Sequence, residues 1–135
     1  MQSEFYTAQL PDDTYTVDNT KLMNGTPDYV VFNGYANQYQ TSPLVAKANR
    51  RIRLFLVNAG TTLFSAFHVI GTIFSDTYLD GNPANHLIGD QTVTVPPGGG
   101  GVVELVIPQA GLYPFVTHSF AGVSKGAVGV LKVTP

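Results

Sequence analysis

Arg51-Ile52-Arg53-Leu54-Phe55-Leu56 is the stretch of the chain in which polar and apolar side chains alternate most regularly. Successive side chains of an extended strand point to opposite faces, so Ile52, Leu54 and Leu56 share the face opposite Arg51 and Arg53. A strand with one apolar face and one wet face belongs to a sheet that covers a core on a single side. The stretch therefore predicts a layered β protein.

Short runs rich in Val, Ile, Phe, Tyr and Thr continue on both sides of this stretch, from Asp28 onward, and Gly, Pro and Asn clusters separate them. This texture is typical of strands joined by turns, and no segment has the pattern of a long helix. Seven to eight strands in about a hundred residues predict an all-β Greek-key sandwich. The expected strands are Tyr29 to Asn33, Arg51 to Asn58, Ser65 to Ile70, Ile73 to Tyr78, Gln91 to Val95, Val102 to Ile107, Leu112 to His118 and Ala127 to Val133.

Residues 1–27 are polar and rich in turn residues, and Asn19 to Asn24 is their one helix-compatible patch. We expect residues 1–27 to be an interdomain linker with one helical turn, and residues 28–135 to be the folded domain. Pro96 to Gly101 is expected to be a loop between two strands. Its prolines lack the backbone donor that a sheet needs, and its glycines are costly to order.

The composition of the 135 residues excludes several classes of protein. Seven Lys and Arg against nine Asp and Glu give a formal charge of -2, so nucleic acid is not an expected partner. No apolar run reaches the roughly 18 residues that a membrane span needs. The chain has no Cys, which excludes disulfides, thiolate nucleophiles and a type 1 (blue) copper site, because that site needs a Cys sulfur.

Three histidines are the main candidates for chemistry, because imidazole titrates near neutral pH and binds metals. His68 lies within or at the end of one apolar strand, and His118 closes another. From spacing alone, these two residues indicate a metal site only weakly, and two partly buried imidazoles bonded to backbone carbonyls explain the pattern as well. His86 lies in a polar loop and is expected to be a solvated surface residue.

Several blocks of sequence carry a more specific signal than these periodicities. They occur in register along the chain, at Asp28 to Gly34, Ser65 to Phe74, Gln91 to Gly99, His118 to Phe120 and Lys125 to Val133. Together they resemble the second cupredoxin domain of copper-containing nitrite reductase, in the multicopper oxidase superfamily. The segment Gln2 to Thr7 extends the resemblance to essentially the whole chain.

The resemblance implies a periplasmic or otherwise extracytoplasmic oxidoreductase, a trimer of two-domain subunits that reduces nitrite to nitric oxide. In this family the first domain holds the type 1 copper and two His ligands of a type 2 copper, and a neighbouring second domain supplies the third, which corresponds to His118. His68 corresponds to the histidine that hydrogen-bonds the bound water or nitrite and helps deliver protons. Ile70 corresponds to the apolar residue that packs over nitrite.

The sequence also departs from the family pattern. The type 1 Cys and the other two type 2 ligands are absent, so the resemblance implies a chain that is not competent alone and needs a type 1 copper domain as partner. Phe120 stands in place of a smaller aliphatic residue, and residues 80–89 match nothing in the family. Two alternatives stay open. One is a free-standing cupredoxin-fold binding or assembly module without catalysis. The other is a domain of another multicopper oxidase, whose His-x-His pairs are missing here.

Overall fold

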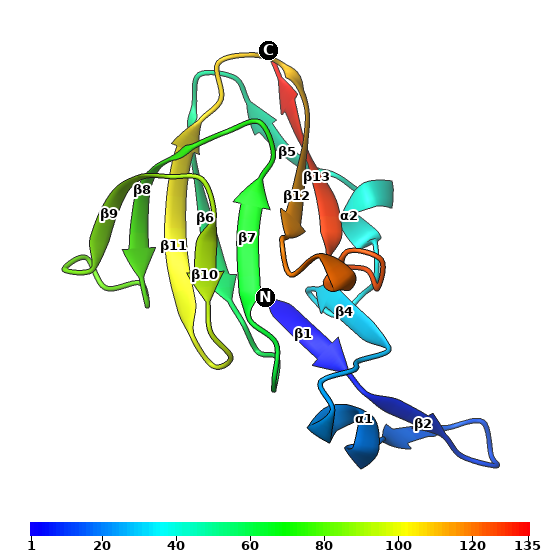
Figure 1. Ribbon diagram of the computed structural model, residues 1–135. Coiled ribbons are helices and arrows are strands. Elements are labelled where there is room, and N and C mark those ends of the chain that lie inside the picture. The colour runs from blue at the N-terminus through cyan, green and yellow to red at the C-terminus, as the bar shows by residue number, and fades with distance from the viewer.

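Two β-sheets lie face to face in the computed structural model, which describes residues 1–135 (Figure 1). Their strands are β5 (Leu44–Lys47), β6 (Arg51–Val57), β7 (Ser65–Val69), β8 (Phe74–Leu79), β9 (His86–Asp90), β10 (Val93–Val95), β11 (Gly100–Val106), β12 (Gly111–Thr117) and β13 (Val128–Thr134). One sheet has the order β10-β7-β12-β13-β5, and the other has the order β6-β11-β8-β9. The chain crosses repeatedly between the sheets, and only β5 and β13 pair in parallel. This arrangement confirms the all-β sandwich that the sequence predicts.

The N-terminal quarter of the chain forms small elements beside the two sheets. They are β1 (Gln2–Phe5), β2 (Thr7–Gln9), β3 (Tyr15–Val17), α1 (Asn19–Met23), β4 (Tyr29–Phe32) and, slightly later, α2 (Gln38–Thr41). Strand β1 pairs with β4, whereas β2 pairs with β3, and Figure 1 shows β2 and α1 extending away from the sandwich. Residues 1–27 thus contain three short strands in addition to the expected helical turn, and their role as a linker stays a prediction. No helix of the chain combines the length and the apolar character that crossing a membrane requires.

The core lies between the two sheets and is centred on aromatic rings. Phe67 of β7 contacts Phe115 of β12 at a centroid distance of 6.0 Å, and Phe32 of β4 lies 5.5 Å from Phe115. The alternation predicted for β6 is confirmed, since its odd-numbered residues are exposed and its even-numbered residues are partly buried. On the neighbouring strand β11, Val103 and Leu105 are completely buried. The apolar faces of both sheets therefore meet as the sequence pattern requires.

A buried carboxylate on β11 binds the arginines on the solvent-facing side of β6. Glu104 lies directly opposite Arg53 in the antiparallel register and is only 1% exposed. Arg53 donates from Nε to Glu104 Oε1 at 2.6 Å, and Arg51 donates from Nη1 to Oε2 at 2.9 Å. Two guanidinium groups therefore compensate one buried charge, which fixes the pairing of these strands.

Three details differ from the sequence-based expectations. Gly100 and Gly101 were expected in a loop, but β11 begins at Gly100, where a Cβ atom would lie 2.8 Å from the Leu56 carbonyl oxygen. Glycine is needed there for a close approach of two backbones. Strands β5 and β9 were not predicted, because β5 is short and β9 is almost wholly exposed and lacks alternation. His86 accordingly begins a strand, although its exposure agrees with the expectation of a surface residue.

We predict that Gly129→Ala strongly destabilises the sandwich. Gly129 lies opposite Phe115, and a Cβ atom there would come within 2.2 Å of the Phe115 ring and 2.6 Å of Tyr39 Cβ. Because these groups are packed in the core, the free energy of unfolding should fall by about 3 kcal/mol, as measured by urea denaturation. The control is Gly111→Ala, where the nearest atom is a Tyr113 ring carbon at 3.3 Å. Equal losses in the two variants would contradict the packing argument.

A second prediction concerns the loss of structure in the N-terminal elements at low pH. Lys21 Nζ lies 2.8 Å from Asp28 Oδ1, and Thr7 donates its backbone N–H to Asp28 Oδ2 at 2.7 Å. The hydrogen bond from Lys21 lowers the pKa of Asp28 from 3.8 to about 2. A carboxylate with a depressed folded-state pKa stabilises the structure above its unfolded pKa and loses that contribution as the pH falls through the folded value.

We therefore expect amide protection of α1 and β2 to fall between pH 3.8 and about 2, before that of the sandwich. Hydrogen exchange followed by NMR measures this loss. Asp28→Asn should reduce this pH dependence, most of all in α1, and Asp13→Asn, in the turn between β2 and β3, should keep it. Unchanged pH dependence in Asp28→Asn would show that another group is responsible.

Candidate functional site

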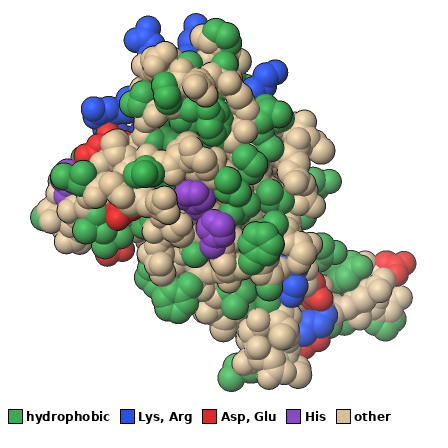
Figure 2. Space-filling model, turned by 45° about the horizontal axis from the view of Figure 1, so that its top comes forward, with side chains coloured by type: hydrophobic (Ala, Val, Ile, Leu, Met, Phe, Trp, Pro, Cys, Tyr) green, Lys and Arg blue, Asp and Glu red, His purple; other side chains and the backbone are tan.

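The pairing of β7 with β12 brings two of the predicted site residues together. In this register Val116 lies opposite His68, and His118 follows one residue after the end of β12. The imidazole rings of His68 and His118 are 5.4 Å apart between centroids, with an interplanar angle of 37°. Figure 2 shows two histidines side by side in the middle of one face of the molecule. Residues fifty positions apart in the sequence thus form one imidazole pair, which we call the histidine pair.

A backbone carbonyl orients the His68 ring. Its Nδ1–H donates to the carbonyl oxygen of Gln91, which precedes β10, and the edge of the ring approaches Phe74 at a centroid distance of 6.4 Å. Because a carbonyl can only accept, this contact places the proton on Nδ1 and leaves Nε2 available to accept a bond or a proton. His68 is therefore the partly buried, carbonyl-bonded imidazole that the simpler interpretation expected, and it also lies next to a second imidazole.

A buried threonine holds the chain on both sides of His118. Thr117 is completely buried, and its hydroxyl oxygen accepts the N–H of Ala66 at 3.0 Å and of Ser119 at 3.3 Å. The N–H of His118 itself donates to the Ala66 carbonyl at 2.7 Å. The imidazole of His118 is exposed, so the backbone is fixed while the ring is free to bind. Sequence reasoning missed Thr117, although a hydroxyl residue at the end of an apolar strand is a signal for such a bond.

Apolar side chains surround the histidine pair. The ring of Phe120 stacks beside His118 at 6.4 Å and 19°, and Phe120 is 64% exposed. Ile70 is 41% exposed, and its N–H donates to the Pro114 carbonyl, which extends the β7–β12 register and places it on the same side as His68. Phe120 therefore lies beside the histidine pair, and Ile70 lies on the same side of the sheet.

The pair does not amount to a complete metal site. No three His, Cys, Asp or Glu side chains of the chain lie close enough together to hold a metal ion. His86 is part of a separate contact on β9, where its Nε2 lies 2.8 Å from Asp76 Oδ1 and its ring stacks on Tyr78 at 4.7 Å. The hydrogen bond with His86 lowers the pKa of Asp76. One chain therefore offers two neighbouring imidazoles for chemistry, and His86 is not one of them.

The chain is similar in sequence and in structure to proteins of known function. No family model matches the chain. A copper-containing nitrite reductase from Neisseria gonorrhoeae is 38% identical to it over 98% of the chain. The structure of a copper-containing nitrite reductase from Thermus scotoductus superposes with a TM-score of 0.88 at 34% identity, again over 98% of the chain. A multicopper oxidase from Staphylococcus aureus is 28% identical over 91% of the chain, so the nitrite reductases are more similar.

The match covers only part of each larger protein. The chain spans 35% of the length of the Neisseria enzyme and 29% of the Thermus chain. The matched part of each protein corresponds to one β-sandwich. The TM-score of 0.88 shows that this sandwich has the cupredoxin fold. The chain is thus homologous, over nearly its whole length, to one cupredoxin domain of the copper-containing nitrite reductases.

Proposed function

We propose that this chain is the second cupredoxin domain of an enzyme that reduces nitrite to nitric oxide, and that His118 is one ligand of a type 2 copper at a subunit boundary. The observation that carries the proposal is the 5.4 Å approach of His68 and His118 on an exposed, apolar surface. The proposal is also supported by the 38% identity of this chain to a copper-containing nitrite reductase. Neither observation alone would identify the reaction, because imidazole pairs also occur in proteins without metals.

The donor chemistry of the pair fits copper in part. Imidazole nitrogen is a ligand that copper favours, and the exposed ring of His118 on a fixed backbone can donate without local unfolding. The chain brings no third ligand to this place, so the remaining donors must come from outside it. We propose a type 1 copper cupredoxin domain of the same or a neighbouring subunit as the partner, in a trimer located in the periplasm or otherwise outside the cytoplasm.

The copper, when bound, would supply the electron and the positive charge that holds the nitrite anion. Conversion of nitrite to nitric oxide consumes one electron and two protons and releases water. We assign His68 to proton delivery, because its Nδ1–H is committed to the Gln91 carbonyl and its Nε2 is left to exchange a proton with a bound ligand. The two rings are 5.4 Å apart between centroids, which supports a role for His68 beside a ligand held at His118.

The apolar side chains would shape the substrate pocket. We propose that Ile70 limits the orientation of nitrite, since it lies on the same side of the sheet as His68. The exposed ring of Phe120, stacked beside His118, would narrow the approach to this position. Covered by the proposed partner domain, these side chains would exclude water and strengthen electrostatic interactions at the reacting atoms.

The proposal predicts a type 2 copper signal that depends on His118. The test is a chimera in which this chain replaces the homologous 35% of the Neisseria gonorrhoeae enzyme. Electron paramagnetic resonance of the copper-loaded chimera should show type 1 and type 2 signals, and His118→Ala should lose the type 2 signal alone. The type 1 signal serves as the internal control for folding. A folded chimera with type 1 copper but no type 2 copper would favour the free-standing binding module.

A further prediction separates the roles of the two imidazoles. In the same chimera, His68→Gln should keep the type 2 signal and lower nitrite turnover by about 100-fold, which is a typical loss when a proton-transferring group is removed. His86→Gln is the matched control, because His86 lies in a separate contact with Asp76 and should leave turnover unchanged. Loss of the type 2 signal in His68→Gln would instead make His68 a ligand, and unchanged turnover would remove it from the mechanism.

A further inference from the structure

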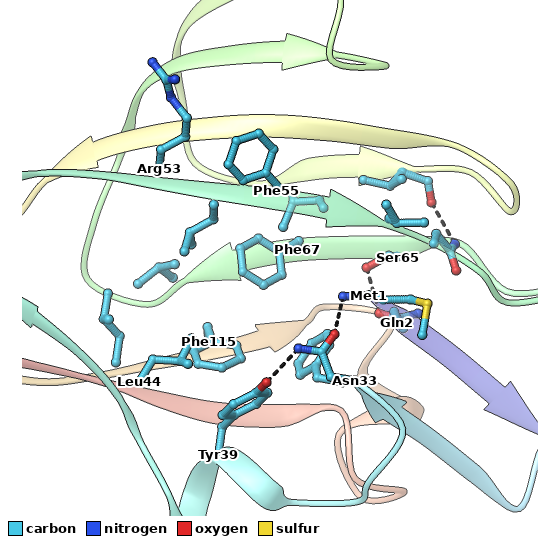
Figure 3. Close-up of a pocket in the computed structure, with 18 residues that line it drawn as sticks. Met1, Gln2, Asn33, Tyr39, Leu44, Arg53, Phe55, Ser65, Phe67 and Phe115 are labelled. Atoms are coloured by element: carbon cyan, nitrogen blue, oxygen red, sulfur yellow. Dashed lines mark hydrogen bonds between the residues drawn. The ribbon is translucent and has the colours of Figure 1, made fainter.

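Polar side chains at the N-terminal end of the chain hold the loop that leads into β7. Gln2 and Glu4 of β1 and Tyr6, which follows it, are spaced two residues apart, as on one face of an extended segment. Each contacts either the β6–β7 loop (residues 58–64) or Ser65, the first residue of β7. Figure 3 shows the contact at Ser65, whose hydroxyl donates to Gln2 Oε1 at 2.7 Å. The N-terminal segment is therefore bonded to the strand that carries His68.

Glu4 makes the largest number of these bonds. Its Oε1 accepts the Leu63 N–H at 2.8 Å, and its Oε2 accepts the Thr62 hydroxyl at 2.9 Å and the Thr62 N–H at 3.3 Å. The hydroxyl of Tyr6 donates to the same Oε2. Gly60 lies so close that a Cβ atom there would come within 2.1 Å of Oε1. Because most residues of the β6–β7 loop are exposed, these bonds contribute more than burial to its conformation.

Ala66 connects this loop to His118. Its N–H donates to the Thr117 hydroxyl at 3.0 Å, and its carbonyl accepts the N–H of His118 at 2.7 Å. Leu63, which Glu4 binds, lies three residues before Ala66 in the chain. A short path of hydrogen bonds and covalent chain thus leads from the Glu4 carboxylate to the backbone of His118.

We propose that Glu4 is a positioning residue for His118. By holding the β6–β7 loop, its carboxylate fixes Ala66 and thereby the backbone from which the His118 ring projects. That ring is exposed, so its direction depends largely on its backbone. A ligand held in place in advance loses less conformational freedom when a metal binds. As a statement about copper, the inference rests on the function proposed above, whereas the effect on the His118 backbone does not.

The first test is hydrogen exchange of the full chain without metal, followed by NMR. Glu4→Gln keeps the shape of the side chain but places an amide NH₂ among donors that need an acceptor. Exchange of the Ala66 and His118 N–H groups should become about tenfold faster, because local opening of the loop releases both. The Ile70 N–H, which donates to the Pro114 carbonyl beyond the other end of β7, should exchange as before.

Two further variants make this test specific. Asp28→Asn removes another hydrogen-bonded carboxylate of the N-terminal elements, one that does not contact the loop, and should leave exchange at Ala66 and His118 unchanged. Thr62→Val removes one donor at an exposed position and should give a smaller increase at the same two N–H groups. This variant also tests the proposal if Glu4→Gln does not fold.

The second test measures copper binding in the chimera described above. Glu4→Gln should keep the type 1 signal and raise about tenfold the copper concentration that half-saturates the type 2 signal, since the His118 ring is then less well placed. A variant that is merely less stable would lose both signals together. Half-saturation at an unchanged copper concentration would overturn the role of Glu4 in copper binding.

The exchange experiment decides the positioning role by itself. Unchanged exchange at Ala66 and His118 in both Glu4→Gln and Thr62→Val would overturn it. Equal acceleration at Ile70 would also overturn it, because it would indicate a general loss of stability. An unmodified chimera without type 2 copper would reject the proposed function, and exchange in the metal-free chain would still establish or refute the positioning by Glu4.

Discussion

The register between β7 and β12 is the constraint on which both the core and the candidate site depend. It places Phe67 opposite Thr117 and Phe115 opposite Val69, so both phenylalanine rings enter the core. The same register turns His68 outward. A shift of one residue would exchange the two faces, exposing the aromatic rings and burying the imidazole. The hydrophobic energy of the core therefore brings the two strands of the histidine pair together, while the Gln91 carbonyl orients the His68 ring.

Buried polar groups then decide where the regular pairing stops. Thr117 takes the N–H of Ala66 with its hydroxyl and thereby ends the β7–β12 ladder next to His118. On the other sheet, a buried polar group fixes the register of two strands. Two arginines of β6 compensate the charge of Glu104 and hold β6 in register with β11. In both cases an unsatisfied buried group would cost more than the bond contributes, which makes these positions specific for one pairing.

The sequence predicted those parts of the structure that rest on local patterns. The alternation from Arg51 to Leu56 marked an amphipathic strand, and eight runs of β-forming residues each correspond to a strand. Strand β9 was not predicted because its residues face solvent and show no apolar alternation. Strand β5 was not predicted because its position depends on parallel pairing with β13, which is distant in sequence. Gly100 appeared to be a loop residue because composition cannot reveal a close approach of two backbones.

The sequence could propose residues for the candidate site but could not predict their geometry. His68 and His118 stood out by their positions at strand ends and by resemblance, yet only the long-range register shows that their rings meet. The Gln91 carbonyl that fixes the His68 tautomer is a backbone group, so no side-chain pattern could have indicated it. The Gln2 amide, buried against Ser65 sixty-three residues away, likewise belongs to the tertiary structure alone.

The geometry of a sheet also bears on the copper site proposed at His118. Side chains on one face of a sheet all point into the same half of space, whereas a metal ion is bound by ligands that converge from several directions. An ion held by His118, as proposed, would therefore need its further donors from another surface. The fixed backbone and exposed ring of His118 are compatible with the proposed shared site. An enzyme with the proposed shared site would be active only where two domains meet, which would couple its chemistry to its assembly.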